Sequence, residues 1–250
     1  MPPEDYARRQ AALEAAGVAR HVIVRNDAIA GWRAGTQQTF GVVIAAGTGS
    51  NTCVLAPDGS EWCYGYYVFY GGAADIAREA LHAVLRAEDG RGHPTTLTGL
   101  VLRKLDYPTP EALLKGWIAG EIDHAALLAL CPLTFEAADA GDEVAAGIIV
   151  KQGNALAEYA TAAIRRFEMQ TLAFDVVLAG SVFKGRGPLL IDTITQAIHC
   201  VAPRVTIVRA ALEPAVGALL LAYDALGIEV TEALVAALRR TMPDPTLFAT

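Results

Sequence analysis

An apolar segment that ends abruptly in a glycine-rich turn constrains the fold of this chain more than any other feature of its sequence. Residues Phe40–Ala46 are apolar and Gly47–Asn51 (GTGSN) follows them directly. This pattern predicts a buried strand and then a tight turn whose glycines let the backbone approach a ligand closely. Backbone N–H groups in such a turn form an anion-binding concavity, to which the hydroxyls of Thr48 and Ser50 add donors. The segment therefore predicts either a phosphate-binding loop or an ordinary glycine-rich hairpin. It is not a Walker-type loop, because no lysine follows.

Two hairpins in series are predicted around this turn. Thr52–Leu55 reads as a strand, Pro57-Asp58-Gly59 is typical of a turn, and Glu61–Phe69 favours a third strand. Upstream, His21–Val24 predicts one further short strand. Near the start of the chain, the Ala-, Glu- and Arg-rich segment Asp5–Ala16 predicts an amphipathic helix.

Beyond these hairpins the pattern changes to helices that alternate with apolar strands. The continuous hydrophobicity of Phe174–Ala179 and Val205–Val208 predicts two short strands that are buried on both faces. Hairpins followed by such alternation indicate an α/β fold, with a mixed sheet covered by helices on both faces. The predicted helices are Ala28–Ala34, Asp75–Ala87, Glu111–Ala119, His124–Leu130, Asp142–Phe167, Pro188–Ala197, Pro214–Leu226 and Thr231–Arg240.

Composition and charge narrow the class of protein. The 250 residues are 53% hydrophobic and 19% charged, which supports a packed core and argues against disorder. A formal net charge of −7 argues against nucleic-acid binding, which favours a basic face. Apolar runs fall well short of the roughly 20 residues that span a membrane. The acidic, Pro-containing start Met1–Asp5 differs from a signal peptide. We therefore expect a cytoplasmic protein that binds neither nucleic acid nor membrane.

The cysteines and histidines are dispersed along the chain. The four cysteines lack a C-x-x-C spacing, and the histidines form no metal-binding pattern, so we expect no metal site. Cys53 and Cys63 lie ten residues apart, on strands that we expect to be neighbours. In an intracellular chain we expect buried thiols rather than a disulfide. The cysteines are Cys53, Cys63, Cys131 and Cys200, and the histidines are His21, His82, His93, His124 and His199.

Two further segments carry candidate chemistry, each with a structural alternative. Asp27 follows the predicted strand at His21–Val24, where a carboxylate can accept a proton from a substrate hydroxyl. The alternative is that Asp27 caps the N-terminus of the next helix. Val176–Phe183 (VVLAGSVF) is a strand that runs into a Gly-Ser turn, where small residues let a flat ring or a ribose lie against backbone. The alternative is an ordinary tight connection between strand and helix.

Taken together and in this order, five segments resemble a known family. They are RNDAIAGWRAG, GVVIAAGTGSN, APDGS, VVLAGSVFKG and EPAVGALLLA. They look like the N-acetylglucosamine kinase and BadF/BadG/BcrA/BcrD ATPase family, which belongs to the actin-like (ribonuclease H-like) superfamily. The resemblance runs from Arg20 to Gly227 and implies an ATPase that binds ATP with Mg²⁺ in the cleft between two domains. It also implies a homodimer.

The resemblance implies roles for particular residues. Asp27 is the base that activates a sugar hydroxyl. The sugar side is lined by Asn26, Asp27, Ser50, Asn51, Gly65 and Tyr66. The nucleotide side is formed by Gly47, Thr48, Gly49, Ala138, Gly180, Ser181 and Gly185. By the same comparison, residues 1–36 are a remnant of the first domain, 37–230 form the second ATPase domain, and 231–250 are a C-terminal helix and tail.

Two departures from the family pattern accompany these matches. The family begins with a first phosphate loop of the type D-G-G-G-T that also organises Mg²⁺, and this chain has no such segment, so the first domain is expected to be largely missing. The family also carries an aspartate after the third strand, whereas Tyr66–Ala73 contains no acid. Phosphoryl transfer depends on positioning and electrostatic stabilisation, so both losses bear on catalysis.

Three functions follow as hypotheses. The first is an ATP-dependent kinase that phosphorylates an amino sugar such as N-acetylglucosamine. The second is a catalytically inactive, truncated homologue that binds a nucleotide or a partner. The third is an ATPase that activates a 2-hydroxyacyl-CoA dehydratase, which the unclustered cysteines disfavour because such activators hold an iron–sulfur cluster.

Overall fold

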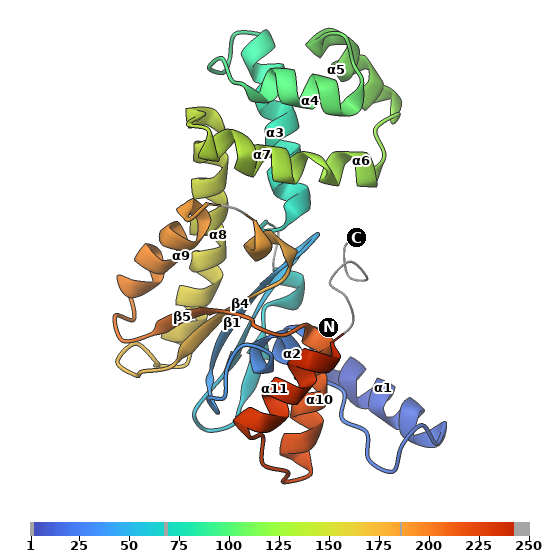
Figure 1. The fold of residues 1–250 in the computed structure, drawn as a ribbon, viewed down its shortest axis with the longest axis vertical. Coiled ribbons are helices and arrows are strands. Elements are labelled where there is room, and N and C mark those ends of the chain that lie inside the picture. The colour runs from blue at the N-terminus through green and yellow to red at the C-terminus, as the bar shows by residue number, and fades with distance from the viewer. Residues whose placement is uncertain (1–2, 68–69, 186, 243–250) are drawn as a thin grey trace.

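A five-stranded mixed sheet lies at the centre of the molecule (Figure 1). The computed structural model describes residues 3–67, 70–185 and 187–242. The strand order is β3-β2-β1-β4-β5; the first three strands form an antiparallel meander, whereas β1, β4 and β5 run parallel. Consecutive hairpins account for the antiparallel half, and long helical crossovers account for the parallel half. The strands are β1 (Gly41–Ala46), β2 (Ser50–Leu55), β3 (Glu61–Cys63), β4 (Asp175–Ala179) and β5 (Thr206–Arg209).

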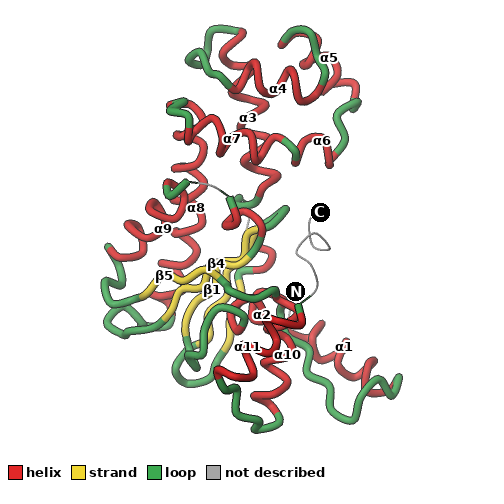
Figure 2. The backbone as a smooth tube through the Cα atoms, in the orientation of Figure 1, coloured by secondary structure: helices red, strands yellow, loops and turns green. Residues whose placement is uncertain are grey.

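Helices cover both faces of the sheet, as predicted (Figure 2). One face packs on α8 (Glu143–Arg166) and α9 (Leu189–His199), and the other packs on α2 (Asp27–Arg33) and α10 (Pro214–Ala225). Because alternate residues of a strand point to opposite faces, the buried strand β1 serves both layers. Its residues Val42, Ile44 and Ala46 join the larger apolar cluster with α8, whereas Val43 joins the cluster with α2.

The crossover between β3 and β4 builds a helical body at one end of the molecule, uppermost in Figure 1. The long helices α3 and α8 connect this body to the sheet, and the shorter helices pack between them. The body and its connections comprise the 3-10 turn η1 (Gly65–Tyr67), α3 (Ala73–Glu88), α4 (Leu97–Leu105), α5 (Pro110–Ala119), α6 (His124–Leu128) and α7 (Leu130–Asp139).

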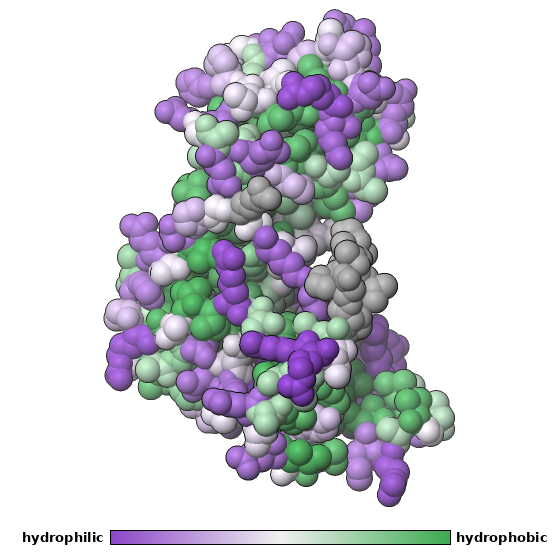
Figure 3. Space-filling model, in the orientation of Figure 1, coloured by the Kyte–Doolittle hydropathy of each residue, from purple (hydrophilic) through white to green (hydrophobic). Residues whose placement is uncertain are grey.

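The remaining elements lie at the opposite end. Helix α11 (Glu232–Thr241) packs beside α10, and α1 (Pro3–Ala15) projects from this end of the molecule. Apolar side chains reach the surface here, among them Val18, Leu226 and Ile228, as the green areas of Figure 3 show. None of the helices in the described ranges is both long and apolar enough to cross a membrane.

Close backbone packing joins α2 to α10. A Cβ on Gly217 of α10 would collide with the carbonyl oxygen of Ala30, so only glycine lets the two helices come this near. Arg33 is buried and donates two hydrogen bonds to Asp224 of α10, with Nε–Oδ2 2.7 Å and Nη2–Oδ1 3.1 Å. A third bond runs to the carbonyl oxygen of Thr36 at 2.8 Å. Small residues and one bidentate ion pair therefore hold α2 in place.

Several of the predicted elements are wrong. His21–Val24 forms no strand but runs as exposed or half-buried irregular chain, because no neighbouring strand in the described ranges pairs with it. The third strand ends at Cys63, where η1 turns the chain away from the sheet. The predicted strand Val205–Val208 is observed as β5, one residue later, at an edge of the sheet; Thr206 and Arg209 at its ends are exposed, so it is not buried on both faces.

Two helices were missed. They are α4 and α7; the predicted helix His124–Leu130 corresponds to α6, and α7 continues almost directly from it through Leu130–Asp139. Of the tail predicted at the C-terminal end, Met242–Thr250, only Met242 is among the described residues. The predicted fold class is confirmed. The errors in the strands lie where pairing or burial depends on residues distant in sequence.

Candidate functional site

The two glycine loops singled out in the sequence lie beside each other at the C-terminal ends of the parallel strands β1 and β4. Gly180 has a φ of 106°, and a Cβ there would collide with the carbonyl oxygen of Ala46. On the other loop, a Cβ on Gly47 would lie 4.0 Å from Ser181 Oγ. In parallel α/β sheets ligands bind at this edge of the strands. The fold therefore brings Gly47, Gly180 and Ser181 to one place.

The N-terminus of α3 fixes the first loop. The backbone N–H of Ala73 donates to the carbonyl oxygen of Gly47 at 2.8 Å, and that of Ala74 donates to Thr48 at 3.1 Å. A Cβ on Gly72 would collide with the loop backbone, so glycine is required for this approach. The carbonyl groups of the loop thus point toward α3 and are satisfied.

The amides of the same loop are left available. Thr48 and Gly49 are exposed, and within the described ranges neither of their N–H groups has a hydrogen-bond partner. Gly47 uses its own N–H to close the turn, donating to the carbonyl oxygen of Gly49 at 2.8 Å. No atom lies within 4 Å of the position of a Cβ on Gly49, so there is open space beside the backbone. Two free amides, a hydroxyl and open space are what an anion such as phosphate requires.

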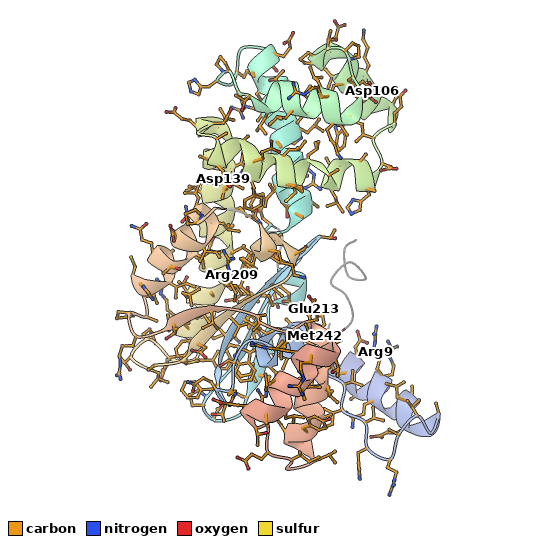
Figure 4. The ribbon with its side chains drawn as sticks, in the orientation of Figure 1. Arg9, Asp106, Asp139, Arg209, Glu213 and Met242 are labelled. Atoms are coloured by element: carbon orange, nitrogen blue, oxygen red, sulfur yellow. A yellow bond between two sulfur atoms is a disulfide. The ribbon has the colours of Figure 1, made fainter. Side chains whose placement is uncertain are left out.

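The second loop is bracketed by two carboxylates. After η2 (Ser181–Lys184), a Cβ on Gly185 would lie 3.7 Å from the ring of Phe135 in α7, one turn from Ala138. Farther on, a Cβ on Gly187 would collide with Asp139 of α7. Lys184 Nζ lies 2.9 Å from Glu213 Oε1 at the start of α10. Figure 4 labels Asp139 and Glu213. Helix α7 therefore brings Ala138 next to the loop that contains Gly185.

A hydrogen-bonded chain links the residues expected on the sugar side. Asn51 Nδ2 donates to Asn26 Oδ1 at 3.0 Å, and Asn51 Oδ1 accepts a bond from the N–H of Gly65, also at 3.0 Å. Asn26 Nδ2 in turn donates to the hydroxyl of Tyr6 in α1 at 3.0 Å. Three segments distant in sequence therefore meet at Asn51. Tyr66 follows Gly65 in η1.

Asp27 is the first residue of α2 and is exposed. The N-cap of α2 is Asn26, whose Oδ1 accepts the N–H of Ala28 at 2.9 Å. The Asp27 carboxylate makes a bond of 3.0 Å to the same N–H. The alternative prediction, that Asp27 is the N-cap of this helix, is therefore wrong, because Asn26 occupies the cap position. Asp27 lies in the first turn, where the helix dipole favours a negative charge.

Ser50 lies between the two groups of residues. Its Oγ is buried and without a hydrogen-bond partner in the described chain, and a Cβ on Gly71 would lie only 2.5 Å from it. The hydroxyl of Tyr70 is buried and unpartnered in the same way. Burial, with the nearby carboxylates of Glu79 and Asp75, raises the pKa of Tyr70, so it is a neutral hydroxyl at every physiological pH. The segment Tyr66–Ala73, which contains no acidic residue, thus presents the neutral hydroxyl of Tyr70 as a hydrogen-bond donor.

Two features of this site were not predicted from the sequence. Tyr6 of α1 reaches Asn26, and no local signal in the sequence predicts that contact. The prediction of buried thiols at Cys53 and Cys63 is wrong: the two are paired in a disulfide, because their position on neighbouring strands places them directly opposite each other. Of the other two, Cys131 is a buried thiol as expected, whereas Cys200 is exposed.

The described part of the chain holds no group of three or more His, Cys, Asp or Glu side chains that could bind a metal ion. Asp27 is the carboxylate next to the Asn26–Asn51 bond. The site therefore combines a loop with two unpaired amides and a set of amide and hydroxyl groups of the kind that orient a polar ligand.

A mixed sheet covered by helices, with glycine loops at the C-terminal ends of its parallel strands β1 and β4, defines an α/β protein. Residues 4–222 match the BadF/BadG/BcrA/BcrD ATPase family. The chain therefore belongs to this family, and its fold is the actin-like ATPase fold.

Named relatives are consistent with this assignment. The chain is 31% identical over 208 residues to an N-acetyl-D-glucosamine kinase of Dictyostelium discoideum, a match that covers 80% of this chain and 65% of the relative. It is 24% identical over 223 residues to an N-acetylmuramic acid/N-acetylglucosamine kinase of Clostridium acetobutylicum, covering 88% and 72% of the two chains. The chain thus spans slightly less than two thirds of the first relative.

Solved structures show the same fold. A protein assigned as an N-acetylglucosamine kinase from Chromobacterium violaceum superposes with a TM-score of 0.59 at 25% identity, covering 86% of this chain and 71% of that one. A second such protein, from Porphyromonas gingivalis, gives a TM-score of 0.62 at 15% identity, covering 89% and 74%. At that identity the likeness concerns the fold alone.

Proposed function

We propose that this protein is an ATP-dependent sugar kinase of the N-acetylglucosamine kinase type. In this proposal it transfers a phosphoryl group to a hydroxyl of an amino sugar such as N-acetylglucosamine. The observation that carries the proposal is the hydrogen-bonded chain Asn26–Asn51–Gly65 next to a loop with two free amides. The names of the relatives point to the same substrate class.

The sugar side uses neutral polar groups and one carboxylate. Amide and hydroxyl groups of Asn26, Ser50 and Asn51 suit the hydroxyl and acetamido groups of a sugar, and backbone at Gly65 and Tyr66 completes this side. Asp27 is the proposed base, which accepts the proton of the attacking hydroxyl. Because it is exposed at the start of α2, its carboxylate can reach a bound ligand.

The nucleotide side is formed by the two loops. In the loop Gly47–Gly49, the free backbone amides of Thr48 and Gly49 and the Thr48 hydroxyl would hold the phosphates, while Gly47 closes the turn and the space beside Gly49 is open. The second loop, with Gly180, Ser181 and Gly185, and Ala138 of α7 would contact the rest of the nucleotide. ATP supplies the phosphoryl group. The described chain has no metal-binding cluster of its own, so we expect Mg²⁺ to arrive with the phosphates of ATP.

The decisive experiment pairs two aspartate variants. Coupled turnover of Mg-ATP with N-acetylglucosamine should fall by about 10²- to 10⁴-fold in kcat for Asp27→Asn, while calorimetric binding of the sugar changes little. Asp106→Asn is the matched control: it lies at the C-terminus of α4, in the helical body, in a left-handed conformation that asparagine also adopts. Full activity in Asp27→Asn would refute the assignment of the base.

A second candidate is a catalytically inactive homologue that binds a nucleotide or a partner. It is favoured by the absence of an acid from Tyr66–Ala73, where Tyr70 offers a neutral hydroxyl in place of a carboxylate. Calorimetric binding of Mg-ATP and sugar without formation of sugar phosphate would support this candidate over the kinase. We expect a cytoplasmic homodimer in either case, and light scattering on the purified chain tests the dimer.

A further inference from the structure

The disulfide between Cys53 and Cys63 adjoins the residues of the proposed sugar site. We propose that this pair is a redox-modification site, at which reduction of the disulfide weakens binding of the sugar; this rests on the proposed function. The pairing is unusual for the cytoplasmic location that we expect, and disulfides there are typically transient and redox-sensing.

The cross-link lies close to the Asn51–Gly65 hydrogen bond along the same pair of strands. Cys53 lies directly opposite Cys63 in the register of β2 and β3. Just beyond the end of β3, the N–H of Tyr64 donates to the carbonyl oxygen of Thr52 at 2.9 Å, and the N–H of Gly65 donates to the side-chain Oδ1 of Asn51 at 3.0 Å. Strand β3 is only three residues long and lies at the edge of the sheet. The disulfide therefore holds the short strand in the register that brings Gly65 to Asn51.

Chemistry at a single oxygen atom connects the disulfide to the sugar site. Asn26 Oδ1 accepts bonds from Asn51 Nδ2 at 3.0 Å and from the N–H of Ala28 at 2.9 Å, which occupy its two lone pairs. Cys53 Sγ lies 3.7 Å from the same oxygen. In the disulfide this sulfur carries no hydrogen and does not compete. As a thiol it carries one, and its weak S–H donor can share Asn26 Oδ1 with the Asn51 amide and so weaken the Asn51–Asn26 bond.

The two sulfurs differ in their access to solvent. Cys53 is fully buried, whereas Cys63 is partly exposed on the edge strand. The thiolate of a dithiol reductant would therefore attack Cys63 Sγ and form a mixed disulfide with it. Cys53 leaves as a thiolate and takes up a proton. The second thiol of the reductant then displaces Cys63, which also becomes a thiol. One protein disulfide is reduced and one dithiol is oxidised, with two electrons and two protons transferred.

The first experiment measures the chemical state and the affinity together. Alkylation followed by mass spectrometry should find two modifiable cysteines in the oxidised, denatured chain, Cys131 and Cys200, and four after dithiothreitol. Calorimetry with N-acetylglucosamine should then give a Kd about five- to tenfold higher for the reduced chain, the effect of one weakened hydrogen bond. An unchanged Kd with four alkylated cysteines would overturn the proposal, as would four alkylated cysteines after treatment with oxidised glutathione.

Three variants separate the cross-link from the thiol. Cys63→Ala leaves Cys53 as a free thiol and should bind the sugar as weakly as the reduced chain, with no response to dithiothreitol. Cys53→Ala removes the competing donor as well and should recover part of the affinity. Cys200→Ala is the matched control, because Cys200 is an exposed thiol outside the sheet, and it should keep the full redox response.

A readout without sugar distinguishes failure of the redox proposal from failure of the proposed function. Amide hydrogen exchange of residues 50–65 should be faster in the reduced chain than in the oxidised one, and unchanged in the α8 segment 143–166. If no sugar binds in either state, this exchange decides: faster exchange confined to 50–65 supports a redox-controlled segment, and identical exchange overturns it.

Discussion

The two faces of the sheet are built in different ways. The face covered by α8 and α9 belongs to the larger apolar cluster, which continues into α3 and α7 of the helical body and has many fully buried Leu, Ile and Val side chains. The face covered by α2 and α10, with α11 beside α10, has two small clusters, close backbone contact at Gly217, and the Arg33–Asp224 ion pair. The large face is therefore the main source of stability, and the small face holds α2, which carries Asn26 and Asp27.

This difference has a consequence for how substitutions act. On the large face, loss of apolar contacts should lower the free energy of unfolding and leave the geometry of the site unchanged in the molecules that stay folded. On the small face, a shift of α10 moves α2 directly. Stability and ligand binding should therefore respond separately to changes on the two faces.

The largest expected effect comes from the same truncation made on both faces. Leu81→Ala on α3 removes a fully buried side chain from the large cluster and should lower the free energy of unfolding by about 3–5 kcal/mol. Leu220→Ala on α10 should cost nearer 2 kcal/mol, because its cluster is small and can collapse. Urea unfolding measures both. Equal losses would contradict the distinction between the faces.

The next effect tests the close packing of α2 on α10. In Gly217→Ala the new Cβ meets the carbonyl oxygen of Ala30, so α2 and α10 must separate, and we expect a loss of about 1–3 kcal/mol together with weaker sugar binding. The matched control is Gly147→Ala on α8, which is exposed and has no atom within 4 Å of the new Cβ. Helix propensity predicts that it stabilises by up to about 1 kcal/mol. Unaltered sugar binding in Gly217→Ala would show that α2 does not depend on this contact.

The smallest effect concerns Asp142, which caps α8 at the far end of the large face. Burial by itself raises the pKa of Asp142, but hydrogen bonds from the N–H of Ala145 and from Thr96 and Thr95 lower it overall, below its ordinary value of 3.8. Asp142→Ala should cost about 1–2 kcal/mol at pH 7. Because the folded pKa is depressed, this stabilisation is complete above about pH 5 and is lost as the pH falls through the folded pKa.

Guanidinium unfolding at pH 7 and pH 3 checks this prediction. The difference in the free energy of unfolding between the original chain and Asp142→Ala should be smaller at pH 3. Asp123→Ala is the control, because Asp123 caps the short helix α6 through a single bond of 2.7 Å to Ala126. Its loss should be nearer 0.5–1 kcal/mol. A loss for Asp142→Ala that stays the same at pH 3 would contradict the assigned pKa shift.

The sequence predicted much of the fold because its signals are local. The strand and glycine turn at Phe40–Asn51 and the helices predicted at Asp75–Ala87 and Glu111–Ala119 each depend on residues within one segment. The errors at His21–Val24 and at β5 depend on which distant segment lies opposite, and no single segment carries that information. The error at Cys53 and Cys63 has another cause, because thiols were expected from the compartment although the two strands were expected to be neighbours.

The candidate site divides in the same way. The sequence alone predicted a loop able to bind phosphate and a carboxylate at Asp27, because the conformational freedom of glycine and the charge of aspartate are properties of individual residues. Folding decided that Asn26 rather than Asp27 caps α2, that Asn51 bonds to both Asn26 and Gly65, and that a disulfide joins the residues two positions away on each strand. These contacts join residues 14 and 25 positions apart in sequence, and only the sheet register and the packing of α2 bring them within hydrogen-bond distance.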